Sequence, residues 1–497
     1  MFKRPKILFI YVNHIADGGE QPIGIASLAT VLKSKGYNFD FCDTSFLISD
    51  PLNRCQFTGH LKTDGDSSGK TEIYDIDAII NRMLLDYDIP EYNIVLISAM
   101  TSTFGIAENI LQKIKQKNPH IMNIMGGIQP TVQPEETITS EYIDAICIGE
   151  GEEALLEFLD LFSRGETYSN VNNFWFKINN NVIKNPLRSY LDVNKLPYPD
   201  YSIFKEEHFY RPFAGKIYRT ISVEISRGCP FDCSYCINSH LKKIYGVRAK
   251  HHRQMSVDNA IERLEYIKET YKPEFLRFVD ESFTIVNTQY LRELSEKYRK
   301  KINIPFWIQT SAVTLNEEKA RLLKEMNCAA VSIGAEHGDE HFRKTVLKKK
   351  VTDKQLYKAM EFLKKYNIRR SAYFMVGLPF ENRSLAFKSI KMYKEFLNTY
   401  GAAPSGIQCF FPFPATGLYN VCLENNFISS NADPEKALYW PALDMPNFTY
   451  NEIIGIKRTF FAYSVMDEKL YPLIEACEEP NQLADKMLNI ISIIYAK

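Results

Sequence analysis

Two long series of apolar segments that alternate with amphipathic segments limit the folds open to this chain of 497 residues. In the first series, apolar runs of strand length at residues 6–12, 93–98 and 121–125 alternate with helical patterns, and several runs end at glycines. Such alternation predicts a doubly wound parallel sheet in an α/β fold. Residues 1–165 are therefore expected to form a Rossmann-like domain that binds its ligand at the carboxyl ends of the strands.

The second series begins at residue 221 and alternates strand candidates with helical stretches. The strand candidates are 221–226, 275–279, 306–310, 329–334, 372–376 and 406–410. These repeats are fewer than the eight of a closed barrel. Residues 216–419 are therefore expected to form an open, partial (β/α)6 TIM-like barrel with its chemistry at the carboxyl ends of the strands.

Two segments lack this alternation. Residues 166–215 predict a hairpin followed by an extended linker, because the prolines of Leu196-Pro-Tyr-Pro-Asp200 favour extended backbone. Residues 420–497 predict a mostly helical C-terminal region.

Charge and hydropathy disfavour several classes of protein. Lys and Arg total 60, as do Asp and Glu, so a nucleic acid partner is disfavoured, since such proteins usually carry a basic excess. No apolar run reaches the ~18 residues of a membrane helix. The basic start resembles a signal peptide, but the apolar run 6–12 is short and lacks a small-residue cleavage site, so a first strand and a cytoplasmic location are expected.

Three of the ten cysteines stand together directly after the first barrel strand. Cys229, Cys233 and Cys236 have the spacing C-x3-C-x2-C, whereas the other cysteines are scattered singly and predict buried, reduced thiols. Three thiolates on one loop can hold an iron–sulfur cluster or, with His240, a zinc ion. A closed zinc site has no reason to stand at the active end of a barrel, so the cluster is favoured.

This motif, with Tyr235 before its last cysteine, resembles that of the radical S-adenosylmethionine (radical SAM) superfamily. The resemblance implies a [4Fe-4S] cluster whose fourth iron is open to the amino and carboxyl groups of S-adenosylmethionine. It also implies an external electron donor similar to flavodoxin or ferredoxin. The reduced cluster would then cleave the S–C5′ bond, and the 5′-deoxyadenosyl radical would take hydrogen from the substrate.

Three further strand ends resemble elements of that superfamily. They are Phe278-Val-Asp280-Glu281-Ser-Phe283, Gly334-Ala-Glu336-His337-Gly338, where His337 replaces the usual Ser, and Phe374-Met-Val-Gly377-Leu-Pro379. Each alone also fits an ordinary turn. By resemblance, S-adenosylmethionine is expected to contact Tyr235, Asp280, Glu281, Glu336 and Gly377, with Glu336 accepting from the ribose hydroxyls and Gly377 admitting the adenine.

The order of the two domains resembles that of the cobalamin (B12)-binding radical SAM enzymes. Matching segments are 21–29, 125–127 and 148–152, and the segment at 196–200 resembles the joint between the domains. The resemblance implies that cobalamin binds at the carboxyl edge of the first sheet. The expected contacts are Gly24, Ser98, Thr101, Gly126, Gly127, Gly149, Glu150 and Gly151.

One departure concerns the cobalt ligand. Cobalamin proteins that use histidine carry D-x-H-x-x-G after the first strand, but Val12 and Asp17 stand where the motif needs Asp and Gly. His14 is therefore only a weak candidate for a cobalt ligand, and cobalt is expected to bind without protein imidazole, unless the domain has lost its corrin.

The expected function is methylation of an unactivated carbon of a small metabolite. One alternative keeps both cofactors but performs cyclisation or oxidation without methyl transfer. Another uses the N-terminal domain only to recognise substrate, as in methylthio-transfer enzymes, although Cys42, Cys55 and Cys147 lie too far apart to hold a second cluster. The non-enzymatic alternative is a zinc-stabilised binding protein.

Overall fold

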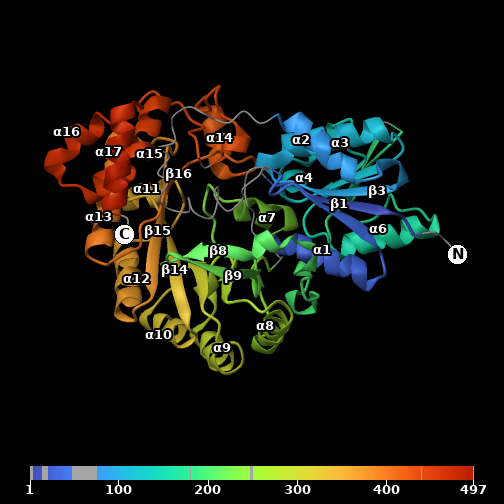
Figure 1. Cartoon of the computed structure of the whole chain (residues 1–497), viewed down its shortest axis with the longest axis horizontal. Coiled ribbons are helices and arrows are strands. Elements are labelled where there is room, and N and C mark those ends of the chain that lie inside the picture. The colour runs from blue at the N-terminus through green and yellow to red at the C-terminus, as the bar shows by residue number, and fades with distance from the viewer. Residues whose placement is uncertain are drawn as a thin grey trace. The chain divides into compact units, whose positions relative to one another are not determined.

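The computed structural model describes residues 4–13, 21–47, 75–179, 181–246, 250–437 and 439–495. They form two compact units, one from the described parts of 1–56, 72–210 and 243–250, the other from the described parts of 211–242 and 251–497. His14 and Cys55 lie outside the described residues. The predicted α/β class is confirmed, with two seven-stranded sheets and covering helices (Figure 1).

The first unit contains a seven-stranded sheet of order β2-β1-β3-β4-β5-β6-β7. Its strands are β1 (Ile7–Tyr11), β2 (Phe39–Asp43), β3 (Ile94–Ser98), β4 (Met122–Gly126), β5 (Ala145–Cys147), β6 (Phe174–Ile178) and β7 (Asn181–Lys184). β1 to β5 pair in parallel, as expected for a Rossmann-like domain. The predicted hairpin, β6 and β7, extends this sheet in antiparallel pairing because Phe174 and Phe176 are buried against it.

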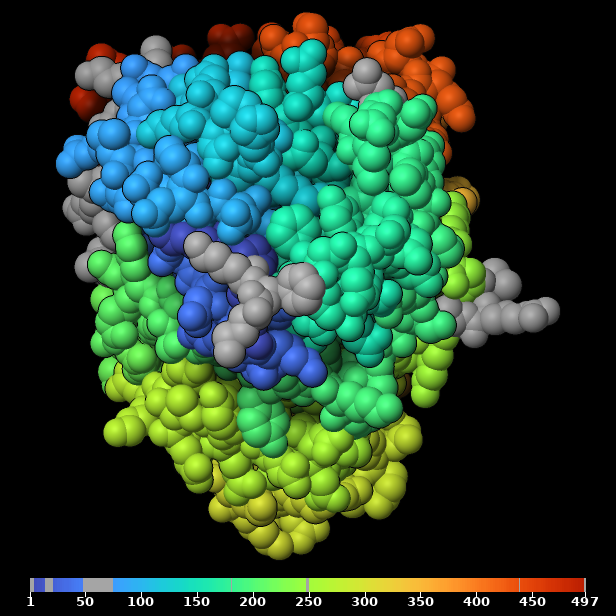
Figure 2. All heavy atoms as spheres, turned by 90° about the vertical axis from the view of Figure 1, so that its right-hand side faces the viewer, coloured from blue at the N-terminus to red at the C-terminus, as the bar shows by residue number. Residues whose placement is uncertain are grey.

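Helices cover both faces of this sheet, which explains why its strands are apolar throughout. They are α1 (Ile23–Ser34), α2 (Ile76–Met83), α3 (Phe104–Lys117), α4 (Ile128–Val132), α5 (Pro134–Thr139) and α6 (Glu152–Arg164). One face packs Leu8, Val95 and Ile97 against Ile110 and Ile114 of α3. In the space-filling view, the light-blue to teal residues of about 75–165 pack above and beside the dark-blue residues from the start of the chain (Figure 2).

The second unit contains a sheet of order β16-β15-β14-β13-β12-β9-β8. Its strands are β8 (Tyr210–Phe213), β9 (Lys216–Val223), β12 (Phe275–Phe278), β13 (Phe306–Thr310), β14 (Cys328–Glu336), β15 (Arg369–Val376) and β16 (Ile407–Cys409). The strands from β9 to β16 pair in parallel, so the predicted partial barrel is confirmed. The first strand ends at Val223, three residues before its expected end.

The helices between these strands are α7 (Asn238–Tyr245), α8 (Val257–Tyr271), α9 (Thr288–Lys301), α10 (Glu317–Glu325), α11 (Glu340–Thr345), α12 (Asp353–Lys365) and α13 (Arg383–Asn398). Of these, α8, α9, α10 and α12 lie along the outside of the sheet (Figure 1). Local capping fixes where several begin. In α12, for example, Thr352 and Gln355 form a reciprocal capping box.

The C-terminal region is mostly helical, as expected. It contains α14 (Gly417–Glu424), α15 (Tyr450–Val465), α16 (Tyr471–Glu475) and α17 (Gln482–Tyr495). Arg383 of α13 donates to both carboxylate oxygens of Glu478, at 2.7 and 2.6 Å, which ties this region to the barrel. Within the described part of the chain, every helix is too short or too polar to span a bilayer.

Candidate functional site

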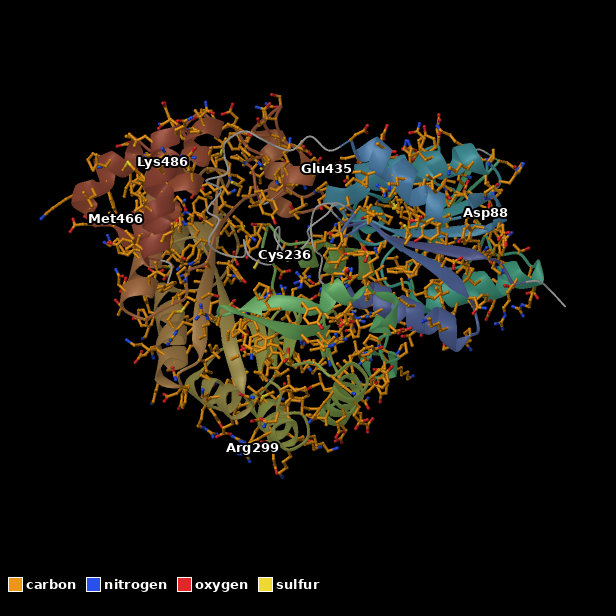
Figure 3. All side chains as sticks on the ribbon, viewed as in Figure 1. Asp88, Cys236, Arg299, Glu435, Met466 and Lys486 are labelled. Atoms are coloured by element: carbon orange, nitrogen blue, oxygen red, sulfur yellow. The ribbon has the colours of Figure 1, made fainter. Side chains whose placement is uncertain are left out.

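The three-cysteine loop lies at the carboxyl end of the first barrel strand. The short strand β10 (Ser226–Arg227) follows β9, and Cys229, Cys233 and Cys236 come between β10 and α7. Figure 3 marks Cys236 on this segment. Each of the three is a free, partly exposed thiol. The motif therefore stands where a barrel carries its chemistry.

Contacts from later parts of the barrel fix the backbone of this loop. Ser234 donates its N–H to the carbonyl of Leu347 at 3.0 Å and its hydroxyl to the carbonyl of Val346 at 2.7 Å. The Lys242 ammonium donates to the carbonyl of Phe231 at 2.9 Å. The loop is thus positioned before any ligand binds, which lowers the entropic cost of binding.

The thiols are protonated at neutral pH when no metal is bound, and a metal would bind them in place of their protons. Burial raises the pKa of the Cys229 thiol to about 11 and also raises that of Cys233. Metal binding must therefore displace protons. Among the described residues, no three His, Cys, Asp or Glu side chains converge closely enough to hold a single metal ion. A four-iron cluster needs less convergence, because each cysteine binds a different iron atom.

The two acidic residues after β12 hold the backbone that leads into the loop. Asp280 is 1% exposed and accepts hydrogen bonds from the Ser226 hydroxyl and, at 3.2 Å, from the Ile225 N–H. Glu281 accepts from the N–H of Gly228 at 3.1 Å, where φ is +83°. Their contact with S-adenosylmethionine stays a prediction; in the structure they support the cysteine loop.

The buried Asp280 predicts a pH dependence of stability. Burial raises its pKa to about 7, above the usual value of 3.8, so the folded state binds this proton more tightly than the unfolded state. The contribution of the protonated Asp280 to the free energy of unfolding is fully present below about pH 4 and is lost as pH rises to about 7. Over that range the free energy of unfolding falls by up to about 1.4 kcal/mol per pH unit. Asp280→Asn should flatten this fall in urea unfolding free energy. Exposed Asp258→Asn serves as the control, and an equal slope in both variants would contradict the assignment.

Glu336 and Lys349 form an ion pair beside the cysteine loop. Glu336, at the end of β14, has a left-handed backbone with φ of +67°. Lys349 Nζ lies 3.1 Å from Glu336 Oε1 and 3.3 Å from the Tyr235 hydroxyl. Burial lowers the pKa of Lys349, but the carboxylate outweighs it and the net pKa is raised. A Cβ at Gly334 would lie 2.4 Å from Glu336 Oε1, so a larger residue at position 334 would displace the Glu336 carboxylate from its place beside Lys349.

A buried histidine and glutamate connect the ends of β14 and β15. His337 Nε2 lies 3.3 Å from Glu381 Oε1, and both side chains are fully buried. His337 Nδ1 accepts from the Asp339 N–H at 2.9 Å, so the imidazole proton belongs on Nε2, facing the carboxylate. Glu381 Oε2 accepts from the N–H groups of Gly377 and Leu378 at 2.7 and 3.0 Å. The two predicted cofactor segments are thus held together.

Removing this imidazole should therefore destabilise the fold. His337→Ala is expected to lower the free energy of unfolding by about 3 kcal/mol, because it leaves a cavity where the fully buried ring packed and removes the neighbour of Glu381 Oε1. Urea unfolding measures the change. His341→Ala, on the exposed side of α11, is the matched control and should differ from wild type by less than about 0.5 kcal/mol. Equal stability of the two variants would contradict the role given to the pair.

In the first unit, several predicted cobalamin residues meet at the carboxyl edge of the sheet. Ser98 and Gly126 are paired at the ends of β3 and β4. Gly127 follows with φ of +99°, and a Cβ there would lie 2.6 Å from the Ala99 carbonyl oxygen. A Cβ at Gly126 would meet no atom within 4 Å. The edge therefore presents bare backbone.

Exposed apolar side chains flank this edge. Met100 and Ile128, which follow β3 and β4, are 42% and 40% exposed. A flat apolar macrocycle such as a corrin suits such a surface better than a fully polar ligand does. The residues present thus fit the cofactor that the family resemblance implies.

The other expected cobalamin contacts lie in the turns around this sheet. Gly24 is in the first turn of α1, Thr101 begins the turn after β3, and Gly151 precedes α6. At Gly149, a Cβ would lie 2.1 Å from the hydroxyl of Tyr245, which accepts from the Glu150 N–H at 3.1 Å. Cobalamin binding by these residues stays a prediction.

Sequence reasoning missed three groups near these positions. Lys349 stands between two other lysines in the run 348–350, and nothing in that run marks which of the three pairs with Glu336. Tyr245, which stacks on Tyr190 with ring centroids 3.7 Å apart, has no motif of its own. His208 Nε2 lies 2.6 Å from Asp43 Oδ2 at the end of β2, although 165 positions separate them.

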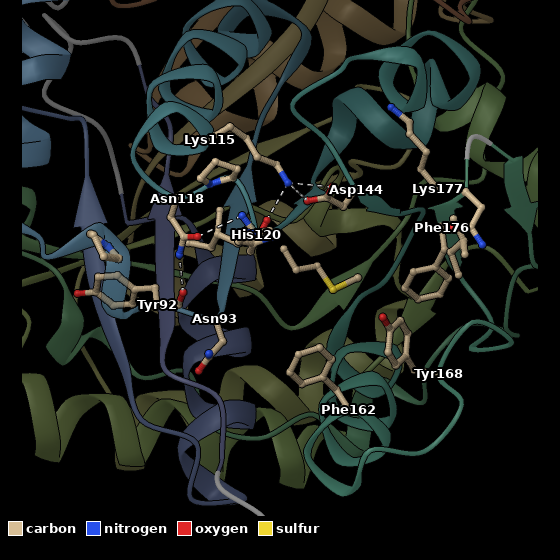
Figure 4. Close-up of a pocket in the computed structure, with 16 residues that line it drawn as sticks. Tyr92, Asn93, Lys115, Asn118, His120, Asp144, Phe162, Tyr168, Phe176 and Lys177 are labelled. Atoms are coloured by element: carbon tan, nitrogen blue, oxygen red, sulfur yellow. Dashed lines mark hydrogen bonds and ion pairs between the residues drawn. The ribbon is translucent and has the colours of Figure 1, made fainter.

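A cavity of about 600 Å³ lies at the opposite, amino-terminal edge of the first sheet (Figure 4). Its charged side chains are already engaged. Lys115 pairs with Asp144 at 2.8 Å, and Lys177 donates to the Ser140 carbonyl at 2.6 Å. This cavity is therefore not the edge at which the fold places a cofactor.

Family models match both units of the chain. The radical SAM superfamily model matches residues 223–388, and the B12 binding domain model matches residues 74–159. The chain therefore contains a radical SAM domain with a B12 binding domain ahead of it, which confirms the two domains expected from the motifs.

Two sequence relatives match most of this chain. An uncharacterized methyltransferase of Pyrococcus horikoshii is 28% identical over 74% of this chain and 77% of its own length. The anaerobic magnesium-protoporphyrin IX monomethyl ester cyclase of Rubrivivax gelatinosus is 24% identical over 79% and 66%, respectively.

Two solved structures share the fold. The radical S-adenosylmethionine methyltransferase TsrM from Kitasatospora setae, with cobalamin and a [4Fe-4S] cluster bound, has a TM-score of 0.61 at 15% identity, covering 86% of this chain and 76% of TsrM. The cobalamin-dependent radical enzyme OxsB has a TM-score of 0.66 at 16% identity, covering 98% and 70%.

Proposed function

We propose that this protein is a radical SAM enzyme that uses a [4Fe-4S] cluster and cobalamin to methylate an unactivated carbon of a small molecule. The observation that carries the proposal is the C-x3-C-x2-C loop at the carboxyl end of the barrel, with the Glu336–Lys349 pair beside it. Cys229, Cys233 and Cys236 would hold the cluster. Gly126, Gly127 and their neighbours at the edge of the first sheet would hold the corrin.

When bound, the cluster supplies an electron to S-adenosylmethionine, and cobalamin supplies a methyl group. The residues of this chain bind, orient and exclude water. Lys349 and Glu336 present one positive and one negative charge, which match the carboxylate and the hydroxyl or amino groups of S-adenosylmethionine. The His337–Glu381 pair fixes the backbone of Gly377, where the adenine would lie.

We further propose that the electron comes from an external flavodoxin- or ferredoxin-like donor, that the substrate is a small molecule rather than a nucleic acid, and that the protein works in the cytoplasm. A reducing compartment suits nine described cysteines that form no disulfide.

Cyclisation is the second candidate function, because the Rubrivivax gelatinosus relative is named a cyclase. The test is to reconstitute the full chain anaerobically with iron, sulfide and hydroxocobalamin, and then to supply dithionite, a small-molecule cell extract and S-adenosylmethionine carrying a CD3 group. Methyl transfer predicts 5′-deoxyadenosine together with CD3-labelled products. 5′-Deoxyadenosine without labelled products would favour cyclisation, and absence of both would contradict either function.

A further inference from the structure

The interior face of the barrel sheet is partly open to solvent, whereas the outer face is closed by helices. On β13, β14 and β15, the outward-pointing Ile308, Val331 and Ala372 are fully buried. Side chains alternate between the two faces of a strand, so the residues next to these point into the interior of the curved sheet. The interior residues that keep part of their surface exposed on β13 to β16 are Trp307, Gln309, Gly334, Ser371, Tyr373 and Gln408.

The register of the strands brings Gln309 and Tyr373 near each other on this face. Gln309 of β13 is paired with Ser332 of β14, which is paired with Ser371 of β15. The hydroxyls of Ser332 and Ser371 lie 2.8 Å apart, as expected for side chains on one face. Tyr373 follows Ser371 by two positions and is paired with Gly334. Because neighbouring strands lie about 4.8 Å apart, β13 and β15 are separated by about 10 Å, which one small molecule can span.

Three of these side chains offer hydrogen-bonding groups to the interior. Within the part of the chain that the structure describes, the Gln309 amide, the Tyr373 hydroxyl and the Gln408 amide form no hydrogen bond. The layer around them is nevertheless ordered, because Trp307 Nε1 donates to Ser332 Oγ at 2.9 Å. Polar groups inside a protein usually bond to another group, to water or to a ligand. The amide of Gln309 and the hydroxyl of Tyr373 are therefore available to a bound molecule.

The charged side chains of this face already have partners. Glu336 pairs with Lys349 beside Gly334, and the Arg277 guanidinium lies over the Trp307 ring, 4.6 Å from its centroid. The groups that remain available are carboxamides and a phenol. They are uncharged, and each can both donate and accept a hydrogen bond. An ionic group would lose part of its hydration at this face without gaining an opposite charge, so the face favours an uncharged polar ligand.

We propose that Gln309 and Tyr373 bind the substrate of this enzyme through hydrogen bonds, and that the substrate carries an uncharged amide group, as in a carboxamide or a lactam. This inference rests on the function proposed above. Such a group has a donor and an acceptor side by side, which match those of the Gln309 side chain in two hydrogen bonds. Tyr373 is paired with Gly334, next to the Glu336–Lys349 pair, so the substrate would lie beside the expected S-adenosylmethionine site.

Isothermal titration of the anaerobically reconstituted full chain, saturated with S-adenosylmethionine and without reductant, tests the proposal. The probes share a benzene ring and differ in the group they offer: benzamide donates and accepts, acetophenone only accepts, and benzoate is charged. We expect benzamide to bind about threefold or more tightly than either of the others. Gln309→Leu and Tyr373→Phe should each weaken benzamide by about threefold or more, because each removes a hydrogen-bonding group at similar volume.

Gln289→Leu, on the exposed side of α9, is the matched control and should bind benzamide as wild type does. A separate titration with S-adenosylmethionine should give the wild-type affinity in all three variants.

The proposal would be overturned by benzamide binding that neither barrel variant weakens, by acetophenone or benzoate binding as tight as that of benzamide, or by no benzamide binding to wild type. Equal losses of benzamide and S-adenosylmethionine affinity would also overturn it, because the two residues would then belong to the cofactor site. Benzamide binding that depends on Gln309, in a protein that never cleaves S-adenosylmethionine, would overturn the proposed function alone.

Discussion

Cys233→Ala is expected to abolish the [4Fe-4S] cluster and with it all cleavage of S-adenosylmethionine. The loop contains three thiols, each expected to bind one iron atom, and no fourth cysteine that could replace a lost one. The two cysteines that are left are therefore not expected to retain the four-iron cluster. Iron and sulfide analysis, visible absorption and the yield of 5′-deoxyadenosine after anaerobic reconstitution measure the loss. Corrin uptake should be retained, because its expected residues belong to the first unit.

Cys477→Ala is the matched control for this experiment. Cys477 is a buried, free thiol that follows α16, far along the chain from the motif. Its variant should keep the full iron content and cleave S-adenosylmethionine at the rate of wild type. If the Cys233 variant retained four irons per chain, or if both variants lost them equally, the assigned ligand set would be wrong.

Lys349→Met is expected to weaken binding of S-adenosylmethionine by about 10- to 100-fold, since a hydrogen bond to a charged group contributes about 1.5–3 kcal/mol. Methionine fills a similar volume without the charge, and Glu336 then faces the ligand without its partner. Equilibrium dialysis with radiolabelled S-adenosylmethionine on the reconstituted protein measures the affinity.

Lys350→Met removes the neighbouring, exposed ammonium and is the control. It should bind S-adenosylmethionine within about twofold of wild type, because exposed charges contribute little. Equal affinity of the Lys349 variant and wild type would show that the ion pair serves only the fold.

The fold was predictable because its signals are local. Apolar runs such as Ile94–Ser98 are the length of one strand, and glycines or caps end them, so the strand order of both units follows from few rules. The three-cysteine motif was recognisable for the same reason: Cys229, Cys233 and Cys236 fall within eight consecutive positions. Spacing alone carries that information.

The contacts that complete the site are not local. Lys349 meets Tyr235 across 114 positions, and His337 meets Glu381 across 44. The hydrophobic periodicity of the sequence does not predict such pairs. Their contact depends on the path of the turns and helices that separate the two residues in the chain. For Asp280 and Glu281, the family resemblance predicts contact with S-adenosylmethionine, which stays a prediction, and only the structure shows that both also hold the loop backbone, through Ser226 and Gly228.

The most direct test of the account is electron paramagnetic resonance of the anaerobically reconstituted, dithionite-reduced full chain, with and without S-adenosylmethionine. We predict the spectrum of a reduced four-iron cluster that changes its g values when S-adenosylmethionine is added, because one iron has no cysteine and can accept the ligand. A spectrum that S-adenosylmethionine leaves unchanged, or a protein that binds no four-iron cluster, would contradict the account.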